Sequence, residues 1–202
     1  MIRHLAGCKQ PNPLPSLPDN DQLPSFHLLV EGFPKTYWLH VAAPANAPLS
    51  KLDKFLRNIW LECCGHMSAF SIEGRRYSAH PMPDMEEKSA SIALGKALEV
   101  GITFSYEYDY GSTTELVLKV VGLRDAPAKK GAVELLARNN APQIICTECE
   151  TGNVATQICA ECSQQEDSGW LCAECSETHE CGEEMQLPVV NSPRVGVCAY
   201  AG

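Results

Sequence analysis

Residues 102–121 read ITFSYEYDYGSTTELVLKVV, and they give the clearest indication of the fold of the first part of the chain. In residues 102–110 apolar or aromatic side chains alternate with polar ones, which is the pattern of a strand with one buried face. Gly111 and Ser112 provide a turn, and residues 115–121 have the β-branched composition of a returning strand. The stretch therefore predicts two sequential strands joined by a tight turn.

Further strands precede this pair. Residues 26–32 and 36–43 have the composition of two strands joined by a short turn. Residues 66–73 and 75–79 read as a hairpin around Gly74. The first part of the chain is therefore rich in β-structure.

One amphipathic helix interrupts the strands. Ser50 and Asp53 have the spacing of a capping box at its start, and Gly65 is suited to end it in a left-handed turn. Its apolar residues fall on one stripe: Leu52, Phe55, Leu56, Ile59, Trp60 and Cys63. Strands on either side of one helix predict an α+β fold.

The last quarter of the chain carries a regular array of metal-ligand residues. Three C-x-x-C pairs start thirteen residues apart, and a histidine and a cysteine follow the third pair. A C-x-x-C turn places two thiolates on one side of a knuckle, as tetrahedral Zn²⁺ requires. Four ligands close one site, so the array predicts two zinc ions. The ligands are Cys146, Cys149, Cys159, Cys162, Cys172, Cys175, His179 and Cys181.

Two pairings of these ligands are open. In a cross-braced arrangement the first and third C-x-x-C pairs share one ion, and the second pair shares the other with His179 and Cys181. In a tandem arrangement the first four ligands hold one ion and the last four hold the other. Cys198 is also available in place of Cys181. The spacing resembles that of B-box and related cross-braced zinc modules, which implies a treble-clef-like fold and favours the first pairing.

Closed sites of this kind indicate a structural role. Saturation with cysteine and histidine leaves no coordination position for a reacting water, so such ions stabilise a fold and do not catalyse. The residues around the array are too few to form an apolar core. Metal binding is therefore expected to supply most of the folding energy of this part.

Charge divides the chain into two parts. The net charge is −9, yet residues 146–202 hold ten acidic residues and one basic residue, Arg194, whereas residues 1–145 hold fifteen of each. Seven thiolates and two Zn²⁺ add about −3. Binding to nucleic acid depends on Lys and Arg that neutralise phosphates, so an acidic module is a poor reader of DNA. A protein partner with a basic surface is expected instead.

The remaining features predict a cytoplasmic protein in four parts. No segment has the roughly 18 apolar residues of a membrane span, and the N-terminus lacks the apolar core of a signal peptide. Clustered C-x-x-C pairs in such a chain indicate metal ligands rather than disulfides. The four parts are a proline-rich tail (1–25), an α+β domain (26–124), a linker (125–145) with a short helix at 132–139, and the acidic zinc module (146–202).

Four stretches between residues 36 and 121 resemble the plasmid pRiA4b ORF-3-like family. They are WLHV at 38–41, IWL at 59–61, GHMSAF at 65–70 and FSYEYDYG at 104–111. The resemblance implies a roll-like α+β fold with a mixed sheet and a link to plasmids and insertion elements, but no defined activity. Family members usually continue the last motif with an acidic residue, a tryptophan and a histidine, where this chain has Ser112, Thr113 and Thr114.

Together these features predict a non-enzymatic zinc-binding protein that acts through protein–protein interaction, accessory to a plasmid or mobile element. One alternative is an enzyme, because Glu107 and Asp109 on one strand face would lie about 7 Å apart beside several tyrosines. Another is a nucleic-acid-associated factor of a transposable element. Cys63, Cys64 and His66 also have the composition of a thiol–imidazole nucleophile, but the helical stripe favours packing in the core.

Overall fold

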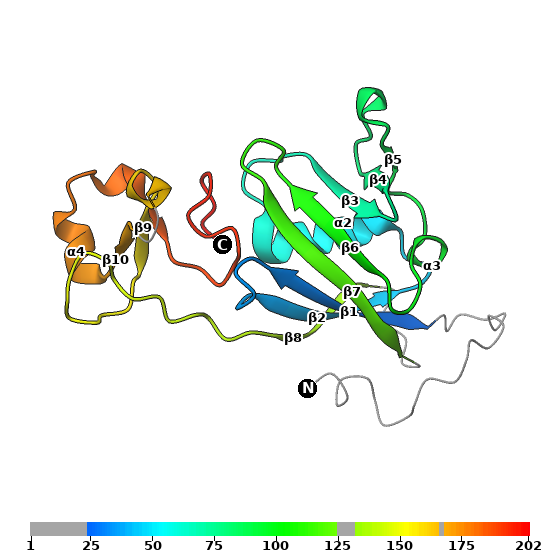
Figure 1. Ribbon diagram of the computed structural model, residues 1–202, viewed down its shortest axis with the longest axis horizontal. Coiled ribbons are helices and arrows are strands. Elements are labelled where there is room, and N and C mark those ends of the chain that lie inside the picture. Colours follow the sequence, from blue (N-terminus) through cyan, green and yellow to red (C-terminus); the bar gives the residue numbers. More distant parts are fainter. Residues whose placement is uncertain (1–23, 125–131, 166–167) are drawn as a thin grey trace. The chain divides into compact units, whose positions relative to one another are not determined.

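The computed structural model describes residues 24–124, 132–165 and 168–202. The chain forms two compact units: residues 1–57 with 67–139, and residues 58–66 with 140–202 (Figure 1). The second unit therefore combines a short segment from the middle of the chain with the cysteine-rich part. Nearly all of the predicted proline-rich tail, and residues 125–131 of the predicted linker, lie outside the described residues.

An eight-stranded mixed sheet forms the first unit, in the order β5-β4-β3-β6-β7-β1-β2-β8. Neighbouring strands are antiparallel except β4 and β5, which are parallel. The strands are β1 (Ser25–Gly32), β2 (Trp38–Pro44), β3 (Ser68–Ile72), β4 (Arg75–Ser78), β5 (Lys88–Ser89), β6 (Thr103–Tyr108), β7 (Thr114–Arg124) and β8 (Glu134–Arg138).

Strands β6 and β7 confirm the hairpin predicted from residues 102–121. They pair directly, with Phe104 opposite Leu118 and Tyr106 opposite Leu116. Every second residue is buried, so each strand turns one apolar face to the core. The buried residues of the pair are Phe104, Tyr106, Tyr108, Thr114, Leu116, Leu118 and Val120.

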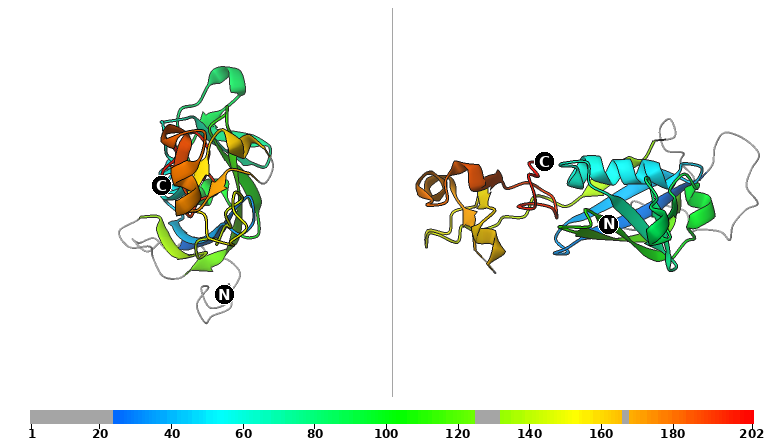
Figure 2. Two further views of the ribbon diagram at one scale, coloured as in Figure 1. Left: turned by 90° about the vertical axis from the view of Figure 1, so that its left-hand side faces the viewer. Right: turned by 90° about the horizontal axis from the view of Figure 1, so that it is seen from above.

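Helix α2 (Leu49–Leu56) is the main helix of the first unit and lies across one face of the sheet (Figures 1 and 2). It buries Leu52 and Leu56 of the predicted stripe, and also Leu49, which precedes the stripe. The chain continues from it into a π-helical turn, η1 (Arg57–Leu61). The other helices of this unit are short: η2 (Pro83–Met85) and α3 (Leu94–Ala97). The predicted combination of a large mixed sheet and one main helix is thus confirmed.

None of the helices in the described part of the chain has the length and apolar character needed to cross a membrane.

The capping box predicted at the start of α2 is wrong. The helix begins at Leu49, directly after Pro48, and no side chain caps it. Asp53 is buried instead, where its Oδ1 accepts hydrogen bonds from Ser68 Oγ at 2.6 Å and from Tyr106 OH at 2.8 Å. Burial, and then the charge of this carboxylate, raises the pKa of Tyr106. Asp53 thus links the helix to the sheet.

The helix predicted at residues 132–139 is also wrong. This stretch contains β8, which pairs with β2 at the edge of the sheet. The backbone N–H of Asn139 donates to Trp38 O at 3.1 Å, and the Asn139 side-chain oxygen accepts from Trp38 N at 3.1 Å. An edge strand presents unpaired backbone groups, and pairing with them outweighs the helical preference of an alanine- and leucine-rich segment.

A pair of buried histidines joins β1 and β2, which the sequence did not predict. Nε2 of His27 and Nδ1 of His40 lie 2.8 Å apart. Burial, followed by the proximity of His40 and Arg124, lowers the pKa of His27 to about 4. The imidazole of His27 is therefore neutral in the folded protein at neutral pH.

Acidification is consequently expected to destabilise the first unit between about pH 6.5 and pH 4. In the unfolded chain His27 binds a proton near its ordinary pKa of 6.5, whereas in the folded chain it does so only near 4. The unfolded state therefore gains protons first as the pH falls, and the free energy of unfolding drops by roughly 2 kcal/mol at pH 5. Urea unfolding at pH 7 and pH 5, followed by hydrogen exchange of β1 and β2 peptides, measures this loss.

His27→Asn, which does not titrate, serves as the comparison. Its free energy of unfolding should change less between pH 7 and pH 5 than that of the native protein. If the free energy of unfolding changed equally in the two proteins, His27 would not be the source of the pH dependence.

The second unit is built around a three-stranded antiparallel sheet in the order β10-β9-β11. Its buried side chains include Ile158 and Leu171 together with Cys146, Cys159 and Cys172. Candidate metal ligands thus occupy much of its core. Its elements are β9 (Gln157–Cys159), η4 (Cys162–Gln164), β10 (Trp170–Leu171), α4 (Ala173–Thr178), η5 (Glu183–Met185) and β11 (Gln186–Pro188).

Candidate metal centres

The eight predicted ligands lie in two clusters of four. Cluster 1 consists of Cys146, Cys149, Cys172 and Cys175. Cluster 2 consists of Cys159, Cys162, His179 and Cys181. Within each cluster the ligand atoms all lie within 4.8 Å of one another. This is the cross-braced grouping, and the structure does not have the tandem grouping.

The distances inside the clusters suit a tetrahedral zinc ion. Zn–S bonds of about 2.3 Å at tetrahedral angles separate neighbouring sulfurs by about 3.8 Å. In cluster 1 the Sγ atoms of Cys149 and Cys172 are 3.9 Å apart. In cluster 2 Cys162 Sγ lies 3.7 Å from Cys181 Sγ and 3.4 Å from Nε2 of His179. Both clusters could therefore hold a zinc ion with little movement of their ligands.

Backbone hydrogen bonds position the first knuckle of cluster 1. Cys146 N donates to Asn153 O at 2.9 Å, and Thr147 N donates to Trp170 O at 2.8 Å. The side-chain amide of Asn153 also donates to Cys172 Sγ at 3.9 Å. The knuckle is thus held against β10, and β10 leads directly to the second pair of ligands.

Helix α4 connects the two clusters. Cys172 precedes its first residue and Cys175 lies in its first turn, so the start of the helix supplies half of cluster 1. His179 follows its last residue and belongs to cluster 2. One short helix therefore sets the separation between the two candidate sites.

The C-x-x-C knuckle of cluster 2, formed by Cys159 and Cys162, requires Gly169, which no spacing or motif had indicated. Its φ is +82°, and a Cβ atom there would lie 2.8 Å from Ser163 N and 3.1 Å from Cys159 O. Its carbonyl also accepts a hydrogen bond from Cys159 N at 2.8 Å. Only glycine combines this backbone conformation with so close an approach.

Gly169→Ala is expected to weaken cluster 2 selectively. The left-handed conformation alone costs about 1–2 kcal/mol with a side chain, and the contact with Ser163 adds to this. Release of metal to a colorimetric chelator should become faster for the ion of cluster 2, while the ion of cluster 1 keeps its native rate. Gly152→Ala is the matched control, because Gly152 has a φ of +72° but nothing within 4 Å of its Cβ position. Equal effects of the two substitutions would show that the contact with the knuckle has no part.

Backbone hydrogen bonds favour the thiolate form of Cys146 and Cys172 in cluster 1 and of Cys159 in cluster 2. At Cys146 burial raises the pKa, but backbone N–H groups, that of Cys172 first, outweigh burial and lower the pKa to about 6. At Cys159 burial is outweighed by the backbone of Cys162 and the side chain of His179, which lower the pKa to about 7. Each cluster thus contains a sulfur that ionises readily.

Cys162 and Cys175 have raised pKa values, because a second negative charge beside an existing thiolate is unfavourable. Hydrogen bonding to Cys181 and then Cys159 raises the pKa of Cys162 to about 12. Hydrogen bonding to Cys172 is the first cause of the raised pKa of Cys175. A divalent cation stabilises every thiolate of a cluster and so lowers the pKa of the remaining thiols. Metal binding should therefore release protons.

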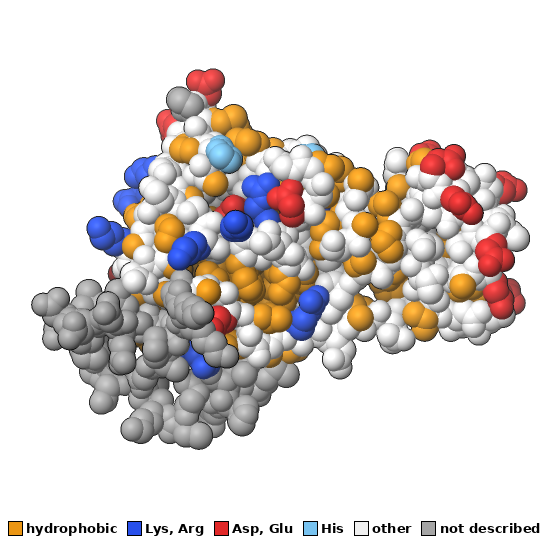
Figure 3. Space-filling model, turned by 180° about the vertical axis from the view of Figure 1, so that it is seen from behind, with side chains coloured by type: hydrophobic (Ala, Val, Ile, Leu, Met, Phe, Trp, Pro, Cys, Tyr) orange, Lys and Arg blue, Asp and Glu red, His pale blue; other side chains and the backbone are white. Residues whose placement is uncertain are grey.

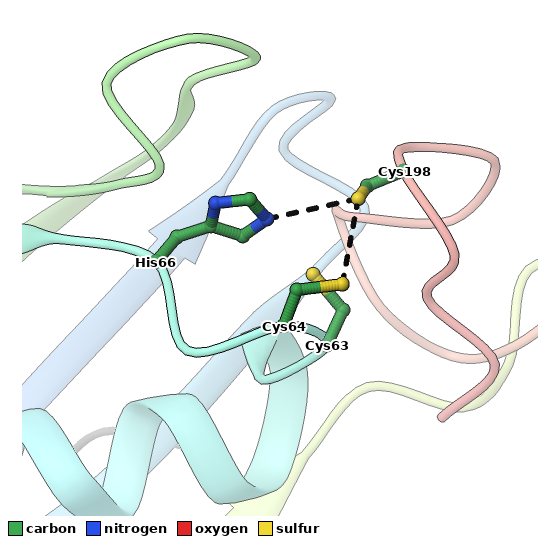
Figure 4. A group of neighbouring side chains, drawn as sticks. All are labelled: Cys63, Cys64, His66 and Cys198. Atoms are coloured by element: carbon green, nitrogen blue, oxygen red, sulfur yellow. Dashed lines mark hydrogen bonds between the residues drawn. The ribbon is translucent and has the colours of Figure 1, made fainter.

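Cys198 does not replace Cys181, contrary to the alternative left open by the sequence. Its Sγ lies 3.7 Å from Cys64 Sγ and 3.6 Å from Nε2 of His66 (Figure 4). Together with Cys63 these residues form a third cluster, cluster 3, whose ligand atoms all lie within 4.8 Å of one another. The expectation that Cys63 continues the buried helical stripe is wrong, because the helical segment ends at Leu61.

Sequence spacing did not reveal cluster 3, because 134 residues separate Cys64 from Cys198. One signal was available. Once eight ligands are assigned to two closed sites, the chain retains a C-C-x-H motif at residues 63–66 and a single cysteine near the C-terminus.

The carboxylate pair predicted at Glu107 and Asp109 is not formed. Strand β6 ends at Tyr108, and Asp109 adopts a left-handed φ of 66°, from which its Oδ1 accepts a hydrogen bond from Gly111 N. The two side chains therefore do not share one strand face. Glu107 is instead paired with Arg76 at 3.0 Å.

An open hollow does lie beside Glu107. Three of the polar groups around it interact with one another: Arg76 lies 3.6 Å from Glu87 and stacks over the ring of Tyr110, whose hydroxyl donates to Glu87 at 2.8 Å. Ion pairing with Glu87 and Glu107 accounts for the position of Arg76 without a substrate. The lining residues are Arg76, Asp84, Met85, Glu107, Tyr110 and Thr113.

The exposed charges of the second unit are acidic. Arg194, the single basic residue of positions 146–202, is completely buried. In the face drawn in Figure 3, acidic side chains lie over the second unit, whereas the visible lysines and arginines lie over the first. Among the described residues of this unit the exposed glutamates are Glu62, Glu148, Glu150, Glu161, Glu174, Glu177, Glu180, Glu183 and Glu184.

Comparisons with known proteins bear on the fold alone. No family model and no curated protein matches the chain. Among solved structures, the chain is similar to the crystal structure of a protein of unknown function, MM3350 from Methanosarcina mazei Go1, with a TM-score of 0.50. The identity is 17%, and the match covers 57% of this chain and 69% of that chain. The resemblance to the plasmid pRiA4b ORF-3-like family, and the mobile-element role that it implies, therefore stay predictions from the sequence.

Proposed function

We propose that this chain is a non-enzymatic zinc-binding protein whose second unit binds a basic segment of a protein partner. The observation that carries the proposal is the charge of that unit. Among its described residues nine glutamates are exposed, Glu62 included, and the single basic residue of positions 146–202 is buried. Like charges held on a rigid surface attract an oppositely charged partner and set its orientation.

Two zinc ions, one in each of clusters 1 and 2, would hold this surface rigid. Their ligands are all cysteine or histidine, which is the donor set of structural zinc. Bound zinc would leave cluster 1 with a net charge of −2 and cluster 2 with −1, adding to the acidic surface. The proposal implies a reducing compartment such as the cytoplasm, because oxidised thiols do not bind zinc.

Binding of synthetic probes to the full zinc-loaded chain tests this function. Fluorescence anisotropy would compare a labelled lysine- and arginine-rich peptide of about twenty residues with a glutamate-rich peptide and a short DNA duplex. Only the basic peptide should bind, and its affinity should fall as the salt concentration rises. Binding of the duplex but not of the basic peptide would overturn the proposal in favour of a nucleic-acid-associated factor.

A matched pair of triple variants locates the binding surface. Replacement of Glu150, Glu174 and Glu177 by glutamine should weaken binding of the basic peptide about tenfold, because each removes an exposed charge at about 0.5 kcal/mol. The control replaces Glu73, Glu99 and Glu115, which are exposed in the first unit, and should retain native affinity. Equal losses in the two variants would point to net charge alone and contradict a surface on the second unit.

A further inference from the structure

We propose that cluster 3, formed by Cys63, Cys64, His66 and Cys198, is a third zinc site. All four residues belong to the second unit, and their ligand atoms lie within 4.8 Å of one another. Three thiolates and one imidazole are a complete donor set for a closed tetrahedral Zn²⁺. This site is additional to clusters 1 and 2, and its existence does not depend on the partner proposed for the protein.

The geometry of cluster 3 matches that of cluster 2, which has the same composition. The sulfur–sulfur distance is 3.7 Å in both, between Cys64 and Cys198 here and between Cys162 and Cys181 there. The sulfur–nitrogen distances are 3.6 Å, from Cys198 to His66, and 3.4 Å in cluster 2. Figure 4 shows His66, Cys64 and Cys198 turned toward a common point from two chain segments.

The segment that carries Cys198, residues 192–198, is held beside the C-C-x-H motif by its own contacts. Ser192 Oγ donates to Trp60 O at 2.6 Å and accepts a hydrogen bond from Arg194 N at 2.9 Å. A Cβ atom at Gly196 would lie 2.7 Å from Ile158, so the backbone packs directly on β9. Cys198 therefore reaches the C-C-x-H motif on an ordered segment and not on a loose end.

The segment that carries Cys198 also supplies a positive charge that compensates the negative charge of the occupied site. Zn²⁺ with three thiolates and a neutral imidazole carries a net charge of −1. The completely buried guanidinium of Arg194 donates to Cys63 Sγ at 3.5 Å. A fixed positive charge beside a ligand sulfur stabilises its thiolate form, which is the form that binds metal. The single basic residue of positions 146–202 is thus placed against a ligand of cluster 3.

Two other uses of these residues fit the arrangement less well. A thiol–imidazole nucleophile needs one cysteine and one histidine, whereas three sulfurs converge here. A disulfide would join only two of the three and leave the imidazole and the third thiol without a role. None of the ten cysteines in the described residues forms a disulfide.

Exposure distinguishes cluster 3 from the other two. Cys64 and Cys198 are exposed, whereas clusters 1 and 2 each contain buried cysteines. Ligands that are open to water exchange their metal more readily than buried ones. The ion in cluster 3 should therefore be the first that a chelator removes.

Native mass spectrometry of the full chain, purified under reducing conditions with zinc present, tests the proposal. Three zinc ions are expected for the native protein, and two for both Cys198→Ser and His66→Gln. Cys8→Ser, which leaves all twelve ligands of the three clusters in place, should retain three. With a colorimetric chelator, one of the three ions should leave before the others, and this fast phase should be missing in Cys198→Ser.

Cobalt substitution guards against a variant that simply unfolds. Tetrahedral Co²⁺–thiolate absorption should fall by about one third in Cys198→Ser and His66→Gln, since clusters 1 and 2 remain filled. Native protein that binds two ions, or variants that still bind three, would overturn the third site. So would a Cys64–Cys198 disulfide found by thiol alkylation in protein that holds two zinc ions. If cluster 1 or cluster 2 did not bind zinc, the Cys198→Ser protein would hold fewer than two ions, which distinguishes that outcome from the loss of cluster 3.

Discussion

Cys172→Ser is expected to remove the zinc ion of cluster 1 and to unfold most of the second unit. Cys172 is buried, is 3.9 Å from Cys149 Sγ, and stands at the start of α4, the helix that also leads to cluster 2. Structural zinc supplies apparent binding energies of about 10–16 kcal/mol in small zinc modules, so the loss of one ligand removes much of the folding energy. Peptides from β9 and β10 should lose their protection from hydrogen exchange.

The sheet of the first unit provides the internal reference for this experiment. Peptides from β3 and β6 should exchange as slowly as in the native protein, because neither strand contains a ligand of cluster 1. Ser176→Ala, a substitution in the same helix that spares the ligands, should keep the full zinc content. A Cys172→Ser protein that retains its zinc and its protection would show that cluster 1 is not a metal site.

Asp53→Ala is expected to cause the largest loss of stability in the first unit. Two buried hydroxyls, those of Ser68 and Tyr106, donate to the same oxygen of Asp53, and Arg57 lies 4.0 Å from its other oxygen. Removal of the acceptor leaves both hydroxyls buried without it, at about 1–3 kcal/mol each. The free energy of unfolding should fall by about 3–5 kcal/mol, measured by urea unfolding with hydrogen exchange of β3 and β6.

Two further variants separate the hydrogen bonds from the volume change. Asp53→Asn keeps the size and one acceptor oxygen, so it should cost less than the alanine variant. Adding Tyr106→Phe to Asp53→Ala should cost little more, because the hydroxyl that has lost its acceptor is then absent. Additive losses in the double variant would contradict a direct interaction between the two side chains.

The periodicity and spacing of residues were enough to predict the structure wherever the interactions are local. The alternation in residues 102–110 predicted β6, because the pleat of a strand turns successive side chains to opposite faces. The constant thirteen-residue interval of the C-x-x-C pairs predicted a two-site array, and the structure groups its eight ligands accordingly. A knuckle brings two thiolates together within four residues, so no knowledge of the rest of the fold is needed.

Local patterns failed where a distant segment changed the outcome. Residues 132–139 favour a helix in isolation, but the open edge of β2 makes them a strand. Asp53 has the spacing of a capping residue, yet Ser68 and Tyr106 bind it in the core. Asp109 continues an alternating pattern, but the turn after Tyr108 rotates it out of the strand.

Residue patterns alone were enough to predict a mixed α/β sheet domain, one main helix and an acidic, cysteine-rich module with two sets of ligands. The three-dimensional fold was needed to show which half-sites share a cluster, and that Cys63, Cys64 and His66 meet Cys198. The difference arises from the sequence distance over which the interactions act. Side-chain period and knuckle geometry act over a few residues, whereas cluster 3 depends on a chain path that returns over more than a hundred residues and is fixed by Ser192, Arg194 and Gly196.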